Sequence, residues 1–262
     1  MTVIAANLGL MYRDRPLTDA IAAAAADGFD AVEFQFPYDT PAEETAAALR
    51  AAGIPALGLN TPLGTGPCAL GFAAVPGYGA EARAAIDRAF AYAEAIGARA
   101  VHVMAGETDG GPAADAAYRD ALSHACDRAA EGGRMVLIEP LNPRQAPRYH
   151  LGSAEQGAEV IEALARPELK LMYDLYHQQI LQGDLVERFK ALAPLVGHVQ
   201  FAAVPDRGAP AADLSGGEIH VGAVLRAIRD AGYGGAAAAE YIPGAPGAGA
   251  LDWLPALRAA LA

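Results

Sequence analysis

The sequence predicts an α/β fold, a single (β/α)8 TIM barrel that spans residues 1–262 as one domain. Two observations lead to this prediction. The first is a recurring unit, in which an alanine-rich helical stretch ends near a glycine and a short apolar run follows. Such alternation is typical of parallel sheets, whose strands are buried on both faces. The second is the length of 262 residues, since one TIM barrel typically takes about 250.

Each predicted strand is a short apolar run that closes one repeat. Several runs follow a glycine, among them Gly28, Gly53 and Gly97, because glycine ends a helix in the left-handed conformation without steric cost. Pro167 breaks the helix before a further run. The predicted strands are Val3–Asn7, Ala31–Phe36, Ala56–Asn60, Ala100–Met104, Met135–Glu139, Leu169–Asp174, Val196–Gln200 and Gly235–Glu240, and the last helix is expected at Asp252–Ala262.

Three long stretches rich in glycine and proline follow predicted strand ends, at residues 61–79, 140–152 and 202–217. In a barrel these are βα loops, which form the active-site face. The alternative fold is an open doubly wound sheet, which usually carries a G-x-G-x-x-G turn after its first strand. The first strand here runs into Asn7-Leu8-Gly9-Leu10, which lacks that spacing, so the barrel is favoured.

The net charge of −12 argues against two classes of partner. Nucleic-acid-binding proteins need a basic face and membrane-surface proteins a polybasic patch, whereas the lysines and arginines here are scattered. No apolar stretch approaches the roughly 20 residues of a membrane span. We therefore expect a small-molecule substrate and no nucleic-acid or membrane partner, while a homo-oligomer stays open.

The cysteines and the N-terminus favour a cytoplasmic location. Cys68 and Cys126 form no C-x-x-C pair and are too few for a disulfide framework, so both are expected to be reduced. The first residues lack a basic start that leads into a long apolar run and a small-residue cleavage site. They are interpreted as the first strand and not as a signal peptide.

Four consecutive predicted strands end in a side chain that carries oxygen: Glu139, Asp174, Gln200 and Glu240. A single acidic residue at a strand end is often a helix cap or one half of a loop salt bridge. Four in succession are different, because neighbouring strand ends lie close together around a barrel rim. Three carboxylates and one amide predict a site for one divalent cation, Mg²⁺ or Mn²⁺, rather than a thiol-rich zinc site.

Longer motifs surround these strand ends: Ile138-Glu139-Pro140-Leu141-Asn142, Tyr173-Asp174-Leu175-Tyr176-His177, Gly197-His198-Val199-Gln200, and Glu240-Tyr241 followed by Pro243. Together they resemble the hydroxypyruvate isomerase family, which lies among the xylose isomerase-like TIM barrels. Weaker similarity at Ala6-Asn7-Leu8, in the stretch from Val32 to Asp39, and at His102–Gly106 extends the resemblance over nearly the whole chain.

The resemblance implies roles for six residues. Glu139, Asp174, Gln200 and Glu240 would ligate the cation, and the catalytic pair Glu139 and Glu240 would also flank the substrate and move protons. His177 would contact a substrate oxygen, with orientation of Asp174 or a buried structural role as alternatives. Arg207 in the loop after the seventh strand would bind substrate, and an exposed loop arginine is the alternative.

The implied reaction is a metal-assisted 1,2-isomerisation of a short hydroxy-oxo acid through an enediolate, with hydroxypyruvate, converted to tartronate semialdehyde, as the first candidate. The near alternatives are a 2-oxotetronate isomerase and a ketose 3-epimerase, although such epimerases usually present histidine where Gln200 stands. Two other classes are a DNA-repair nuclease on the same barrel, which the charge disfavours, and a non-catalytic sugar-acid-binding barrel, which the retention of both glutamates disfavours.

Three departures from the family pattern fall in loops that bear on substrate specificity. The loop at Leu63–Gly71 lacks the G-D-W…E-R-G segment. Ile242 replaces the lysine or arginine of the E-Y-[KR]-P motif, and the loop Asp206–Glu218 lacks most of the usual P-[GD]-T-G-E run. The predicted metal ligands are untouched, so the reaction class follows from the sequence more firmly than the substrate does.

Overall fold

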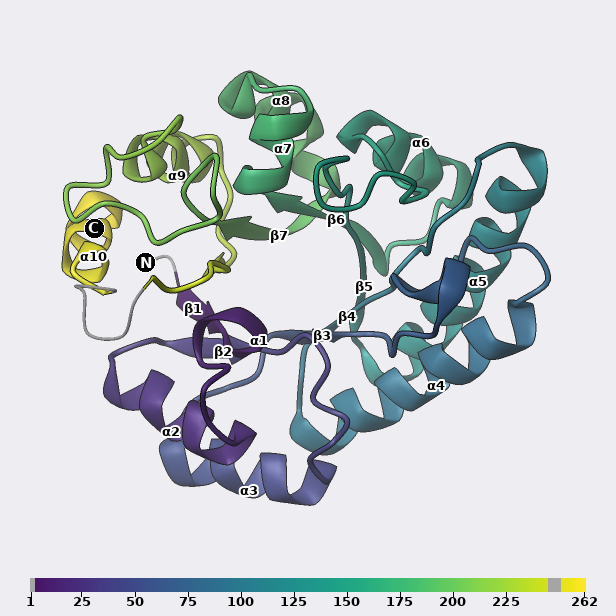
Figure 1. The fold of residues 1–262 in the computed structure, drawn as a ribbon, viewed down its shortest axis with the longest axis horizontal. Helices are drawn as coiled ribbons and strands as arrows, with labels where there is room; N and C mark the ends of the chain where they lie inside the picture. Colours follow the sequence, from purple (N-terminus) through teal and green to yellow (C-terminus); the bar gives the residue numbers. More distant parts are fainter. Residues whose placement is uncertain (1–2, 245–250) are drawn as a thin grey trace.

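Eight parallel strands close into a barrel in the part of the chain that this computed structural model describes, residues 3–244 and 251–262 (Figure 1). The predicted fold is therefore confirmed. Each strand coincides with one predicted apolar run. The strands are β1 (Ile4–Asn7), β2 (Ala31–Glu33), β3 (Gly58–Asn60), β4 (Ala100–His102), β5 (Met135–Ile138), β6 (Leu169–Asp174), β7 (Val196–Phe201) and β8 (Ala237–Ala239).

The order around the barrel follows the chain, and β1 also pairs with β8. The seam between β2 and β3 is closed by main-chain contacts instead of a full ladder. Val32 bridges to Ala56, and the amide of Leu57 donates to the Val32 carbonyl at 2.8 Å. The Phe34 amide donates to the Gly58 carbonyl at 2.9 Å, so the ring is complete.

The helices lie outside the strands and cover the barrel (Figure 1). The helix-ending glycines act as predicted, because Gly53, Gly97 and Gly133 all take left-handed backbone angles. The described helices are α1 (Leu8–Met11), α2 (Leu17–Ala26), α3 (Ala42–Ala52), α4 (Gly79–Ile96), α5 (Pro112–Gly132), α6 (Ala154–Leu164), α7 (Leu175–Leu181), α8 (Leu185–Leu192), α9 (Val221–Asp230) and α10 (Trp253–Leu261), with short 3-10 turns at Gly66–Cys68 and Ala193–Leu195.

The hydrophobic core lies between the strands and the helices. Trp253 of α10 is completely buried and packs edge to face against Phe201 and Tyr241, which anchors the last helix across the β7–β8 side of the barrel. Cys68 and Cys126 are buried free thiols. Among the described residues, no helix is both long and apolar enough to cross a membrane.

The inside of the barrel is only partly filled. TIM barrel interiors are usually packed with branched side chains. Here Gly58, Ala100, Gly197 and Ala236 leave a cavity of about 240 Å³ inside the ring of strands. At one end the cavity reaches Glu33 and Gln200, which stand at or near the carboxyl ends of β2 and β7. This cavity, called the axial cavity below, therefore lies directly beneath the active-site face.

Candidate active site

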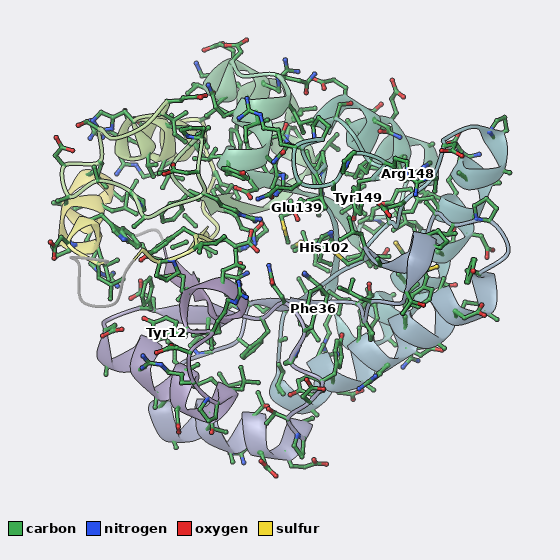
Figure 2. All side chains as sticks on the ribbon, in the orientation of Figure 1. Tyr12, Phe36, His102, Glu139, Arg148 and Tyr149 are labelled. Atoms are coloured by element: carbon green, nitrogen blue, oxygen red, sulfur yellow. The ribbon has the colours of Figure 1, made fainter. Side chains whose placement is uncertain are left out.

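The strand register brings the predicted rim residues to one face of the barrel. Asp174 and Gln200 are direct partners in the β6–β7 ladder, while Glu139 follows β5 and Glu240 follows β8. All four side chains are buried. Carboxylates are rarely buried without a partner, so this rim must be compensated by a positive charge. Figure 2 shows Glu139, with His102 beside it, toward the centre of the ring of strands.

Arg207 supplies such a charge. Its Nη2 atom lies 2.6 Å from Glu240 Oε2 and 3.6 Å from Asp174 Oδ2. Its Nη1 atom donates to Gln145 Oε1 at 3.1 Å, and the guanidinium stacks on the Tyr176 ring with its central carbon 5.1 Å from the ring centroid. The structure thus places Arg207 inside the site and not on an exposed loop.

The tightest potential ligand group in the described residues is Glu139, Asp174 and His177, whose ligand atoms lie within 4.8 Å of one another. The hydrogen bonds of His177 argue that this residue donates rather than ligates. Its Nδ1 accepts the backbone amide of Asn142 at 2.9 Å, so the neutral ring carries its proton on Nε2. That Nε2 faces Asp174 Oδ2 at 3.7 Å and Glu139 Oε1 at 4.0 Å.

Burial and mutual repulsion perturb the ionisation of the rim. Burial, with Glu240 and Asp174 nearby, raises the pKa of Glu139 well above its ordinary value. Burial raises the pKa of Asp174 to about 7, although Arg207 opposes the shift. The pKa of Glu240 is also raised, mainly by burial. Burial lowers the pKa of His177 well below its ordinary value, in agreement with a neutral ring.

The unpaired oxygens of the rim fit a divalent cation. Glu139 Oε1, Asp174 Oδ2 and Gln200 Oε1 are buried and have no hydrogen-bond donor among the described residues. Buried acceptors without donors are uncommon in folded proteins. Hard oxygen ligands of this type suit Mg²⁺ or Mn²⁺. The ligand atoms of Glu139 and Asp174 lie within 4.8 Å of each other, and one arginine among three carboxylates leaves room for the charge of a cation.

The sequence reasoning missed a layer of polar residues beneath the rim. Asn7 and Gln35 each place an amide nitrogen near Glu240 Oε1, at 3.1 and 3.0 Å. Glu33 and His198 contact each other through Glu33 Oε2 and His198 Nε2 at 2.7 Å. The signal was available, because Asn7 and Glu33 end β1 and β2 just as Asp174 ends β6.

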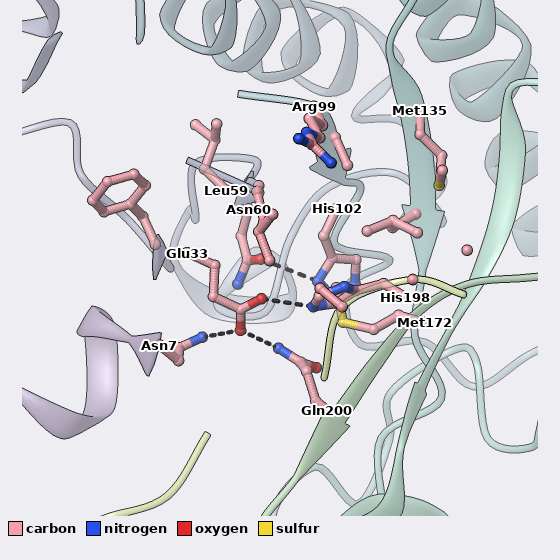
Figure 3. A pocket seen from close by; sticks show the side chains of 18 residues that line it. Asn7, Glu33, Leu59, Asn60, Arg99, His102, Met135, Met172, His198 and Gln200 are labelled. Atoms are coloured by element: carbon pink, nitrogen blue, oxygen red, sulfur yellow. Dashed lines mark hydrogen bonds and ion pairs between the residues drawn. The ribbon is translucent and has the colours of Figure 1, made fainter. Parts of the chain in front are cut away.

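His102 belongs to the same layer. Its Nδ1 lies 3.2 Å from Asn60 Oδ1 and 3.8 Å from Glu139 Oε2. Burial lowers the pKa of His102 to about 3, so the ring is neutral. Figure 3 shows His102 and Asn60 beside the Glu33–His198 contact, at the wall of the axial cavity. The ring supports the rim from below without carrying a charge.

A barrel of eight parallel strands with a buried acidic rim at its carboxyl end is the class of protein to which the comparisons also lead. A model of the xylose isomerase-like TIM barrel family matches residues 21–257. The chain belongs to this family. The resemblance to hydroxypyruvate isomerases predicted from the sequence is confirmed, and the chain is an enzyme of the isomerase class.

Two curated relatives and one solved structure illustrate the likeness. The 2-oxo-tetronate isomerase of Cupriavidus necator is 39% identical over 258 residues, covering 97% of this chain and 98% of the relative. The hydroxypyruvate isomerase of Escherichia coli is 30% identical, covering 98% and 100%. A Brucella melitensis structure described as an AP endonuclease of family 2 is 33% identical, with a TM-score of 0.91 over 97% of this chain and 98% of that one.

Proposed function

We propose that this protein isomerises a short 2-oxo acid that carries a hydroxyl group on C3, with one divalent cation, Mg²⁺ or Mn²⁺, as cofactor. The observation that carries the proposal is the composition of the rim. It contains two glutamates that can move protons, Glu139 and Glu240, together with buried oxygens that have no hydrogen-bond donor and the guanidinium of Arg207. Hydroxypyruvate and 2-oxo-tetronate both have the required C2 carbonyl and C3 hydroxyl. The relatives named above support both substrates.

Glu139, Asp174, Gln200 and Glu240 would hold the cation. When bound, the cation would polarise the substrate carbonyl and stabilise the negative charge that develops on oxygen. Arg207 is the cationic side chain of the site, and it would take the substrate carboxylate in a bidentate contact. His177 would donate its Nε2 proton to a substrate oxygen.

The proton transfer requires a base and an acid on the two sides of the C2–C3 bond. One of Glu139 and Glu240 would remove the C3 proton, and the electron pair of the C3–H bond would form the C2–C3 double bond of an enediolate. In that step the π pair of the C2 carbonyl would move onto its oxygen. The other glutamate would then deliver a proton to C2 while the proton of the C3 hydroxyl passes to the C2 oxygen, which leaves the carbonyl at C3 and a hydroxyl at C2. A carboxyl group suits either role, because it can accept a proton from carbon in one direction and return it in the other.

The test is proton exchange with the solvent. The protein, loaded with Mg²⁺ or with Mn²⁺, is incubated in D2O with hydroxypyruvate or 2-oxo-tetronate, quenched, freed of metal and followed by NMR. We expect deuterium at C3 of the remaining substrate and at C2 of the product. Absence of exchange with both substrates and both metals would overturn the proposal, and the faster substrate identifies the preferred one.

Glu139→Gln should abolish exchange, because the amide keeps a metal-binding oxygen but cannot accept the proton. We expect a loss of at least about 100-fold in the exchange rate, within the range that general-base catalysis contributes. The matched control is Glu162→Gln, the same change at an exposed position of α6, which should exchange at the wild-type rate. Exchange by Glu139→Gln at the wild-type rate would show that this glutamate does not move the proton.

The description of the Brucella structure raises the nuclease alternative, which the charge of this chain does not favour. Nucleases must neutralise phosphates along a backbone, whereas the site described here has Arg207 facing three carboxylates. A nicking assay on abasic DNA with Mn²⁺ checks this. We expect no cleavage above that of the Glu139→Gln variant.

A further inference from the structure

We propose that Glu33 is a positioning residue, which fixes the side-chain amides of Gln200 and Asn7 so that Gln200 Oε1 faces the cation. The inference rests on the metal site of the proposed function and adds a residue that does not itself touch the cation. Four contacts beneath the rim carry it, and Figure 3 shows the three that Glu33 itself makes, with Gln200, Asn7 and His198.

The first two contacts decide which way the amides point. Glu33 Oε1 accepts from Gln200 Nε2 at 2.6 Å and from Asn7 Nδ2 at 2.8 Å. A carboxylate has no proton to donate, so only the NH₂ end of each amide can face it. The oxygen of Gln200 is therefore turned away from Glu33, where it is buried and has no donor. Among the described residues, Gln200 Nε2 has no other acceptor, so without Glu33 no side chain would hold the NH₂ end of the amide in place before the cation binds.

The third contact links the same carboxylate to the proton-transfer residue Glu240. The Asn7 amide has two N–H groups and lies within reach of Glu33 Oε1 and also of Glu240 Oε1, at 3.1 Å. Gln35 Nε2 donates to the same Glu240 oxygen at 3.0 Å. Glu33 thus holds Gln200 directly and steadies Glu240 through Asn7.

The fourth contact holds Glu33 itself. His198 stands two residues before Gln200 on β7, so both side chains project to the same inner face. Its Nε2 atom lies 2.7 Å from Glu33 Oε2. Glu33 is therefore an acceptor with every oxygen engaged.

The axial cavity explains why hydrogen bonds, and not packing, must do this. Glu33, His198 and Gln200 all line it, so these side chains border open space instead of being enclosed by packed neighbours. An amide released from Glu33 would have space to turn. Groups that orient metal ligands in this way typically contribute 10- to 100-fold to metal affinity or activity.

The experiment compares Mn²⁺ binding by calorimetry in wild type, Glu33→Leu and Glu33→Gln. Both variants remove the same charge, but only Glu33→Gln keeps an acceptor oxygen for the Gln200 amide. We expect Glu33→Leu to weaken Mn²⁺ binding by at least about tenfold and Glu33→Gln by clearly less. Equal losses in the two variants would mean that the charge alone matters and would overturn the inference, as would binding within twofold of wild type in both.

A double-mutant cycle separates orientation from general damage. In a Gln200→Ala background, Glu33→Leu should produce little further loss of Mn²⁺ affinity, because the amide it positions is gone. Fully additive losses would overturn the inference. Met172→Leu, which lines the same cavity without contacting Glu33, is the control and should bind Mn²⁺ like wild type.

Thermal unfolding of each variant and Mn²⁺ binding by the wild-type protein separate the possible reasons for a negative result. Thermal unfolding identifies a variant that fails to fold. If Glu33→Leu fails to fold, Glu33→Gln takes its place in the test. Glu33→Gln should then lower the Mn²⁺ affinity of the wild-type protein but change the affinity of the Gln200→Ala variant little. No fall of affinity, or fully additive losses in the double variant, would overturn the inference. If the wild-type protein itself binds no Mn²⁺, the proposed metal site fails and the inference falls with it. Wild-type binding with unaffected variants overturns only the role of Glu33.

Discussion

Three carboxylates of the rim share one guanidinium, which leaves the site short of positive charge. Arg207 reaches Glu240 and Asp174 directly, whereas Glu139 Oε1 has no hydrogen-bond donor among the described residues and lies 4.0 Å from His177 Nε2. His177 is neutral, so it does not correct the imbalance. A bound cation and Arg207 would therefore compete for the oxygens of Asp174 and Glu240, so each should weaken the interaction of the other with these carboxylates.

This competition predicts that Arg207→Ala affects metal and substrate in opposite directions. Without the guanidinium, Mn²⁺ affinity of the substrate-free protein should rise, because Asp174 and Glu240 lose their rival partner. The KM for the 2-oxo acid should rise by about tenfold or more, because its carboxylate loses a charged hydrogen-bond donor. Calorimetry and steady-state kinetics measure the two effects.

The matched control is Arg148→Ala, which removes the same charge from an exposed position. It should leave both quantities within about twofold of wild type. A fall of Mn²⁺ affinity in Arg207→Ala would contradict the competition.

At the scale of elements, β7 and the loop that follows it contribute more to the site than any other segment. The strand supplies His198 and Gln200, and the loop returns Arg207 over the barrel. The backbone of Arg207 takes positive φ, and its carbonyl accepts the Ile242 amide at 2.8 Å. Ile242, which stands where the family motif has a lysine or arginine, thus supports Arg207 through its backbone amide.

The strand ends also show how far sequence reasoning reached. Short apolar runs predicted every strand, because burial on both faces leaves a clear local pattern. The rim positions followed, since a residue at a strand end must lie at the barrel mouth. Glu33 and His198 were missed because they are 165 residues apart and their contact depends on barrel closure. The direction of Arg207 was equally inaccessible, because loop geometry sets it.

The conformation of the loop after β3 depends on a glycine, Gly71. Gly71 has a φ of +112°, and a Cβ there would lie 2.2 Å from the Met104 carbonyl oxygen. Gly71→Ala should therefore destabilise the protein by roughly 2 kcal/mol or more, from strain and from the clash together. Gly77 has a φ of +87° but nothing within 4 Å of its Cβ position.

Gly77→Ala is accordingly the matched control, with strain but no clash. Chemical denaturation of the two variants gives the comparison. An equal loss of unfolding free energy in both would show that the contact with Met104 is relieved by a small shift of the loop.

For the whole molecule, the rim makes stability depend on pH in the absence of metal. Asp174 has a pKa of about 7 in the folded protein and 3.8 as its ordinary value. The folded state therefore binds more protons between these values. Its contribution to stability is complete below about pH 3.8 and is lost as pH rises toward 7. Glu139 and Glu240, with raised pKa values, act in the same direction.

We therefore expect the melting temperature of metal-free protein to be lower at pH 8 than at pH 6, and Mn²⁺ to raise it more at pH 8. The reason is that the cation takes the place of the protons, so its binding releases them. Thermal scans with and without Mn²⁺ test this. The variant Asp174→Asn should show a weaker pH dependence without metal. A metal-free protein that is more stable at pH 8 would contradict the assigned protonation of the rim.

The axial cavity has a consequence for how this barrel could change. Ala100 opens β4 and Ala236 stands just before β8, so both line the cavity at the end away from the acidic rim. Larger apolar residues are normally rejected from a packed interior. Here they would enter empty space, and filling such space commonly adds about 0.5–2 kcal/mol of stability. Larger apolar residues at this end of the axial cavity should therefore raise the thermal stability of the barrel without changing the acidic rim at the other end.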